Sequence, residues 1–155
     1  MRNTIAALLA AAALAGCEGN AVPDHRSFTL TREGVLVQSP ADSRSVTLEL
    51  PGWLWAGEPH LPPALALGPN GEAVITSNVA PTLWRVDPRT LAVSVHPLVL
   101  DTDTDKDVGF ASIAYDPKRG AFIAYSDIQR SVWKIDRRLE TATKIARPDL
   151  LAGNE

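Results

Sequence analysis

The chain contains two copies of one stretch, and this internal repeat limits its fold more than any other feature. The first copy starts at Leu65 and the second at Ile113, with one extra residue in the second copy at Arg119. The identical pairs are Ala66/Ala114, Pro69/Pro117, Gly71/Gly120, Ser77/Ser126, Trp84/Trp133, Asp87/Asp136 and Arg89/Arg138. From Gly71 onward the spacing is a constant 49 residues. Two segments of such similar pattern are expected to take the same fold.

Each copy is expected to form four short strands separated by tight turns. The expected strands are 65–67, 73–77, 82–87 and 91–95 in the first copy, and 113–115, 121–126, 131–136 and 141–145 in the second. In the third strand apolar residues alternate, so Trp84 and Val86 share one face while Leu83 and Arg85 share the other. Because Trp133 occupies the same position as Trp84, we expect both indoles to lie in the core.

The turns of the repeat carry residues with a physical reason to be there. Gly71 and Gly120 are available for a positive φ, and the preceding proline pre-sets the turn. Asp87 and Asp136 directly follow the third strand, where an aspartate side chain can accept hydrogen bonds from the backbone of its own turn.

Repeats of 40 to 50 residues with about four strands each are typical of β-propeller blades. The stretch IAYDPKRGAFIAYSD…SVWKID (113–136) resembles the repeats of six-bladed propellers of the NHL and SMP-30/gluconolactonase-like superfamily, and also YVTN-type repeats. The resemblance covers residues 61–147. It implies blades but not an activity, because binding scaffolds and enzymes share these repeats.

The segment before the repeats resembles a worn third copy. Residues 32–39 correspond to the second strand and 43–50 to the third, without a tryptophan. The expected fold is therefore all-β, an incomplete β-propeller of two clear blades and one degenerate blade. Propellers usually close with four or more blades. Three outcomes stay open: pairing with a second copy to complete a ring, an open stack of blades, or a shortened relative of a longer propeller.

The first seventeen residues form a processing signal. Arg2 is followed by an apolar run at 5–14 and by Leu-Ala-Gly-Cys at 14–17. This order is typical of a secretory signal peptide, expected to be helical. The run covers about 15 Å as a helix, half of a ~30 Å hydrocarbon core. The tetrapeptide resembles the lipobox of bacterial lipoproteins, in which the cysteine sulfur receives a diacylglycerol and the chain is cut before it.

The lipobox resemblance implies three regions and a location. Residues 1–16 are the signal peptide, 17–26 a lipidated tether, and 27–155 the β domain. Cys17, the single cysteine, would hold the protein on a membrane. Glu18 follows it, and the absence of aspartate there favours the outer membrane, facing the periplasm. A net charge of −3 and the lack of a basic run argue against nucleic acid as a partner.

An acidic run is a weak candidate for calcium. Asp101, Asp103 and Asp105 alternate as in the opening of an EF-hand loop. The pattern then departs, because Lys106 stands where glycine belongs and Ser112 where glutamate belongs. A solvated loop between blades explains the run equally well. No metal site or cofactor is therefore predicted.

A proline-rich segment, PGWLWAGEPHLPP (51–63), carries Trp53 and Trp55. In an extended segment both rings fall on one face. They are either a binding surface for a sugar or peptide, or a cover over the apolar face of the first intact blade.

Catalysis has little support in the sequence. There is no G-x-S-x-G or H-E-x-x-H motif, and His25, His60 and His96 have dissimilar surroundings. The resembled lactonases bind a divalent metal with side chains from several blades. Asn78 and Asp127 occupy equivalent strand ends, but too few blades follow to complete such a site. The expected function is a binding or scaffolding lipoprotein that contacts a protein partner or itself. The alternative is a truncated relative of a sugar-lactonase-like hydrolase.

Overall fold

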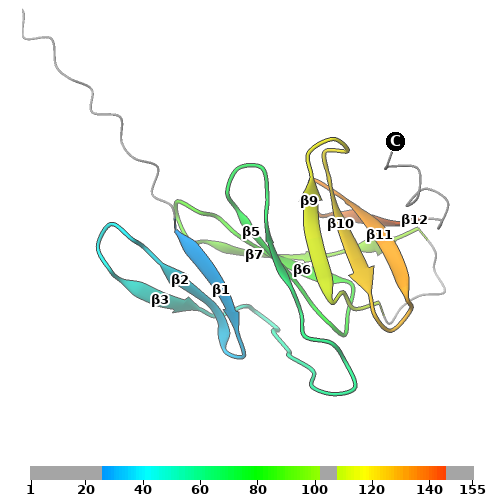
Figure 1. Cartoon of the computed structure of the whole chain (residues 1–155), viewed down its shortest axis with the longest axis horizontal. Coiled ribbons are helices and arrows are strands. Elements are labelled where there is room, and N and C mark those ends of the chain that lie inside the picture. The colour runs from blue at the N-terminus through cyan, green and yellow to red at the C-terminus, as the bar shows by residue number, and fades with distance from the viewer. Residues whose placement is uncertain (1–25, 102–107, 146–155) are drawn as a thin grey trace, which may run out of the picture.

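The computed structural model describes residues 26–101 and 108–145 (Figure 1). Regular structure in these residues consists of strands in three separate sheets, none of which closes on itself. The expected all-β fold class is therefore confirmed. Nowhere in the described ranges is there a helix with the length and apolar character needed to span a membrane. The signal peptide and Cys17 lie outside these ranges.

The N-terminal sheet is an antiparallel meander of three strands. It contains β1 (Ser27–Thr31), β2 (Gly34–Gln38) and β3 (Ser45–Leu48), in the order β1-β2-β3. The strands β2 and β3 confirm the two strands expected at 32–39 and 43–50. Strand β1 was not expected.

The two repeats form the middle and the C-terminal sheet. The middle sheet contains β4 (Leu65–Leu67), β5 (Ala73–Thr76), β6 (Thr82–Val86) and β7 (Val93–Pro97). The C-terminal sheet contains β9 (Ser112–Asp116), β10 (Ala121–Ser126), β11 (Ser131–Asp136) and β12 (Thr141–Ile145). A short strand, β8 (Val99–Leu100), pairs in parallel with β12 and adds a fifth strand to the C-terminal sheet. All eight expected repeat strands are present.

The repeat extends to the register of the strands. Ile75 lies opposite Trp84 in the middle sheet, and Ala124 lies opposite Trp133 in the C-terminal sheet. The cross-strand pair of Leu65 and Ile75 likewise corresponds to the pair of Ile113 and Ala124. The pair of Leu83 and His96 corresponds to the pair of Val132 and Ile145. The sequence repeat is thus a repeat of backbone pairing, with the extra residue at Arg119 absorbed in the β9–β10 turn.

The three sheets follow one another in chain order, and the middle sheet is covered on both faces (Figure 1). Ala73, Ile75 and Trp84 pack against Val35 and Val37 of the N-terminal sheet. The opposite face packs in a second cluster that contains Val74, Leu83, Phe110, Phe122 and Trp133. Trp84 is 3% exposed and Trp133 is fully buried, which confirms both as core residues.

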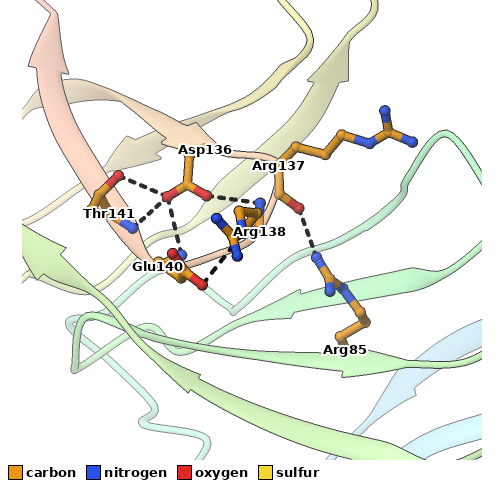
Figure 2. Close-up of polar contacts among 6 residues, drawn as sticks. All are labelled: Arg85, Asp136, Arg137, Arg138, Glu140 and Thr141. Carbon is orange, nitrogen blue, oxygen red and sulfur yellow. Dashed lines mark hydrogen bonds and ion pairs between the residues drawn. The ribbon is translucent and has the colours of Figure 1, made fainter.

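Aspartates close the turns after the third strands, as expected. Asp87 accepts hydrogen bonds from the backbone N–H of Arg89 and Thr90, both at 2.8 Å. Asp136 accepts from the N–H of Arg138 at 2.7 Å, and its other oxygen accepts from the Thr141 hydroxyl at 2.7 Å (Figure 2). Gly71 and Gly120 have φ angles of 80° and 59°, so the positive φ expected at both turns is confirmed.

The Asp136 turn predicts a pH-dependent contribution to stability. Burial raises the pKa of the Asp136 carboxyl, but the hydrogen bonds from Thr141 and from the backbone outweigh it and leave the pKa below its ordinary value. A carboxylate with a lowered folded-state pKa stabilises the fold above the unfolded value of about 3.9, and this contribution is lost as the pH falls through the folded value.

Asp136→Ala is therefore expected to reduce the free energy of unfolding at pH 7 by about 1–2 kcal/mol, through lost hydrogen bonds. Urea denaturation at a series of pH values should show the difference from wild type shrinking below about pH 4. Glu140→Gln is the control, because its ion pair with Arg138 is solvent-exposed. If the free energies of unfolding of wild type and Asp136→Ala differ by a constant amount down to pH 2, this role of Asp136 is contradicted.

Candidate functional site

The loop 51–63 joins the N-terminal sheet to the middle sheet, and its first tryptophan packs against the core. The Trp53 ring meets the Trp84 ring edge-on, with centroids 5.2 Å apart. Its indole N–H donates to the carbonyl oxygen of Arg32 at 3.1 Å. Trp53 is thus a partly buried residue that packs against the cluster between these two sheets.

Trp55 lies next to Trp53 but at a right angle to it. The ring centroids are 6.3 Å apart and the planes differ by 87°, so the two indoles do not form one flat platform. The Arg32 guanidinium lies 5.3 Å from the centroid of the Trp55 ring, within the range of a cation–π contact. Trp55 is half-buried. Trp53 is half-buried as well, so the two candidates differ in their contacts.

Asn78 holds the loop in place from the end of β5. Its side-chain NH₂ donates to the carbonyl oxygens of Ala56 at 2.8 Å and Leu61 at 2.9 Å. Its side-chain oxygen accepts from the Ala56 N–H at 3.3 Å. Asn78 is 3% exposed, so its side chain is shielded from water while its backbone partners are partly exposed. The sequence singled out Asn78 as a strand-end residue, but its amide is engaged in fixing the loop.

The loop also presents apolar side chains to solvent on either side of Trp55 in the sequence. Leu54 is 67% exposed and Leu61 is 49% exposed. Leu54, Trp55 and Leu61 are called the loop surface below. The backbone beneath the loop surface is hydrogen-bonded at two points to one buried side chain, so a ligand that docks here has less loop entropy to remove.

The calcium candidates are only partly within the described residues. Asp101 ends the segment that carries β8, and its two carboxylate oxygens accept from the backbone N–H of Lys144 at 3.2 and 3.3 Å. This contact extends the pairing of β8 with β12. Asp103 and Asp105 lie outside the described residues. Within the described ranges, no three His, Cys, Asp or Glu side chains gather as metal ligands would.

A cleft of about 570 Å³ at the end of the middle sheet was not expected from the sequence. Its charged or polar lining residues are Asn70, Glu72, Arg85, Asp87, Arg89 and Ser94. Glu72 accepts from the Asn70 N–H at 2.8 Å, and Arg85 donates to the Arg137 carbonyl oxygen at 2.7 Å (Figure 2). Several of these groups therefore hold turns of the protein itself.

The two described histidines lie apart from each other in the fold. His60 belongs to the loop 51–63, whereas His96 lies on β7. The Nε2 atom of His96 is 2.8 Å from the Ser94 hydroxyl oxygen. Burial, and then the charge of Arg85, lowers the pKa of the His96 imidazole. This environment favours the neutral imidazole near pH 7, while the charges of Glu140 and Asp136 act on its pKa in the opposite direction.

No family model, curated protein or solved structure matches this chain. The residues and their geometry are therefore the basis for any functional conclusion.

Proposed function

We propose that this chain is a lipid-anchored binding protein that presents propeller-type blades, and the loop surface on them, to a protein partner in the periplasm. The lipobox at 14–17 supports the anchor. The equal register of the middle and C-terminal sheets supports the blades, because propeller blades are repeated four-stranded meanders.

The observation that carries the binding role is the loop held by Asn78. Single exposed leucines are common, but Leu54 and Leu61 are exposed on the same loop as Trp55, and the backbone of this loop is fixed by hydrogen bonds to the buried side chain of Asn78. Aromatic side chains such as Trp55 are enriched in the central part of protein interfaces. The same amide of Asn78 weakens the lactonase-like alternative, since it is occupied with Ala56 and Leu61.

The anchor predicts a complete change of location. Cys17→Ser removes the sulfur that would carry the diacylglycerol. Without these acyl chains the protein loses its stable hold on the bilayer. Membrane fractionation with mass spectrometry of the N-terminus is the measurement. We expect a lipid-modified Cys17 in the wild type and no lipid in the variant. An unmodified Cys17 in membrane-bound wild type would contradict the anchor.

The loop surface predicts position-specific crosslinking in cells. A photoreactive amino acid at Leu54 should give an adduct of defined mass with a protein partner, and Leu61→Ser in the same chain should reduce its yield at least fivefold. Thr29, exposed on the N-terminal sheet, is the matched control position. Equal adducts from positions 54 and 29, or none from position 54, would contradict the binding role.

A further inference from the structure

One side chain fixes the point where the tether joins the β domain. Arg26 directly precedes β1, and its guanidinium Nη1 donates to the carbonyl oxygens of Pro88 at 2.9 Å and Arg89 at 3.3 Å. Both carbonyl groups belong to the turn between β6 and β7 of the middle sheet. The tether therefore joins the domain beside this turn.

The turns on this side of the three sheets form one end of the molecule, called the turn end below. It consists of Arg26 and the segments 39–44, 68–72, 87–92, 116–120 and 136–140. Arg85 donates to the Arg137 carbonyl oxygen at 2.7 Å, which joins the turns of the middle and C-terminal sheets at this end. The turns between β4 and β5 and between β9 and β10 lie at the top of Figure 1, and the loop 51–63 lies at the bottom.

The loop surface and the tether lie at opposite ends of β1. Arg32 follows β1, and its carbonyl oxygen accepts from the Trp53 indole N–H of the loop 51–63. The five residues of β1 span roughly 17 Å as an extended strand. The loop surface is therefore separated from the point of attachment by the length of this strand.

The tether is short enough to keep the turn end near the bilayer. The nine peptide units from Cys17 to Arg26 reach at most about 30 Å when fully extended. A lipid on Cys17 therefore holds the turn end within that distance of the membrane surface. The loop surface could reach the same bilayer only if the tether doubled back along β1.

Three exposed cations of the turn end, Arg89, Lys118 and Arg137, form no ion pair within the described residues. The Arg137 side chain points away from Arg85 in Figure 2, although its backbone carbonyl accepts from that residue. The charges of these three side chains are therefore available to an anionic ligand.

Four carboxylates of the turn end are engaged within the protein. Asp87, Asp116 and Asp136 each accept hydrogen bonds from backbone N–H groups of their own turns, and Glu72 is 6% exposed. Over the whole turn end, positive side chains slightly outnumber carboxylates. At the opposite end, over 31–34, 49–64, 77–81 and 127–130, carboxylates outnumber positive side chains. This distribution favours the turn end facing an anionic surface.

We propose that the turn end docks on the anionic phospholipid headgroups of the membrane that carries the anchor, so that the loop surface faces away from the bilayer. This proposal rests on the proposed lipid anchor at Cys17. Guanidinium and ammonium groups donate charge-assisted hydrogen bonds to phosphate oxygens. Because few cations take part, docking is weak and reversible, and it depends on the tether to keep the domain close to the surface.

Photocrosslinking of the full chain to vesicles tests this docking. Cys17 is the only cysteine, so its thiol can be added across the double bond of a maleimide-bearing lipid, whether or not cells lipidate it. A photoreactive amino acid replaces Thr90, in the turn end, or Ile128, exposed at the opposite end. On vesicles with about 30% anionic phospholipid, we expect at least about threefold more lipid adduct from position 90 than from position 128.

Neutralising the free cations tests the headgroup contact itself. Lys118→Gln combined with Arg137→Gln should lower the lipid adduct from position 90 at least about twofold, and should weaken its dependence on salt between about 0.05 and 0.5 M. Arg130→Gln, at the opposite end, is the matched control and should leave the adduct unchanged. Circular dichroism melting checks that each variant is folded.

Two results with the coupled chain would overturn the docking. One is equal adduct from positions 90 and 128, and the other is equal adduct from position 90 on neutral phosphatidylcholine vesicles. Absence of lipid on Cys17 in cells would overturn the proposal through the anchor instead. The two failures are distinguishable, because the chemically coupled chain does not depend on lipidation in cells.

Discussion

Trp133→Ala is expected to lower the free energy of unfolding by about 3–5 kcal/mol, the range for removing a buried aromatic side chain. Trp133 is fully buried. Its ring meets the Phe110 ring edge-on at 6.4 Å, and its indole N–H donates to the Ser131 hydroxyl at 2.8 Å. The substitution removes this packing and leaves a cavity between the middle and C-terminal sheets.

Urea denaturation followed by circular dichroism is the measurement, with two comparisons built in. Trp84→Ala should cost a similar amount, because Trp84 holds the equivalent position against the N-terminal sheet. Trp55→Ala should cost less than half as much, since Trp55 is only half-buried. A loss below about 1 kcal/mol for Trp133→Ala would mean that the sheets do not pack as described.

Gly109→Ala is expected to cost about 2–4 kcal/mol, by overpacking and by loss of a backbone hydrogen bond. A Cβ atom at position 109 would stand 2.1 Å from the carbonyl carbon and oxygen of Asn78, which is far inside van der Waals contact. The next residue, Phe110, donates its N–H to the Ser77 carbonyl oxygen at 2.7 Å. The added methyl group must push this segment away and weaken that bond.

The effect of Gly109→Ala should also reach the loop surface. Asn78 holds the loop 51–63, so a shift of its backbone changes the position of Ala56 and Leu61. Acrylamide quenching of tryptophan fluorescence is expected to increase in the folded variant. Gly57→Ala is the matched control, because a Cβ there meets nothing within 4 Å. Equal stability of the two variants would contradict the close approach at Gly109.

The repeat made the strands of the middle and C-terminal sheets predictable. Similar segments at a fixed spacing must satisfy their backbone groups in the same way, and the alternation around Trp84 and Trp133 set which face is buried. The pattern of turn residues then placed the strand ends. Aspartates at positions 87 and 136 were expected to accept from their own turns, and they do.

Two strands were missed for different reasons. Strand β1 has no counterpart in the repeat, although the alternation of Phe28 and Leu30 with small polar residues was a readable signal of a strand. Strand β8 has only two residues, and its parallel partner β12 lies more than forty residues later in the chain. Pairing of this kind depends on the tertiary fold and leaves no periodic signal in a short segment.

The role of the candidate site residues was less readable than the strands. The sequence placed Trp53 and Trp55 on one segment but did not show that their rings make different contacts. That difference depends on contacts with Trp84 and Arg32, which are distant in the chain. The role of Asn78 was also hidden, because its hydrogen bonds reach back to a loop more than fifteen residues earlier.

The central claim is that the two repeats form sheets in the same register, and nuclear magnetic resonance of the isotope-labelled full chain tests it most directly. We predict cross-strand nuclear Overhauser contacts between the backbones of Ile75 and Trp84, and the equivalent contacts between Ala124 and Trp133. Helical chemical shifts in either repeat, or a different pairing partner for Trp133 than the residue equivalent to Ile75, would contradict the claim.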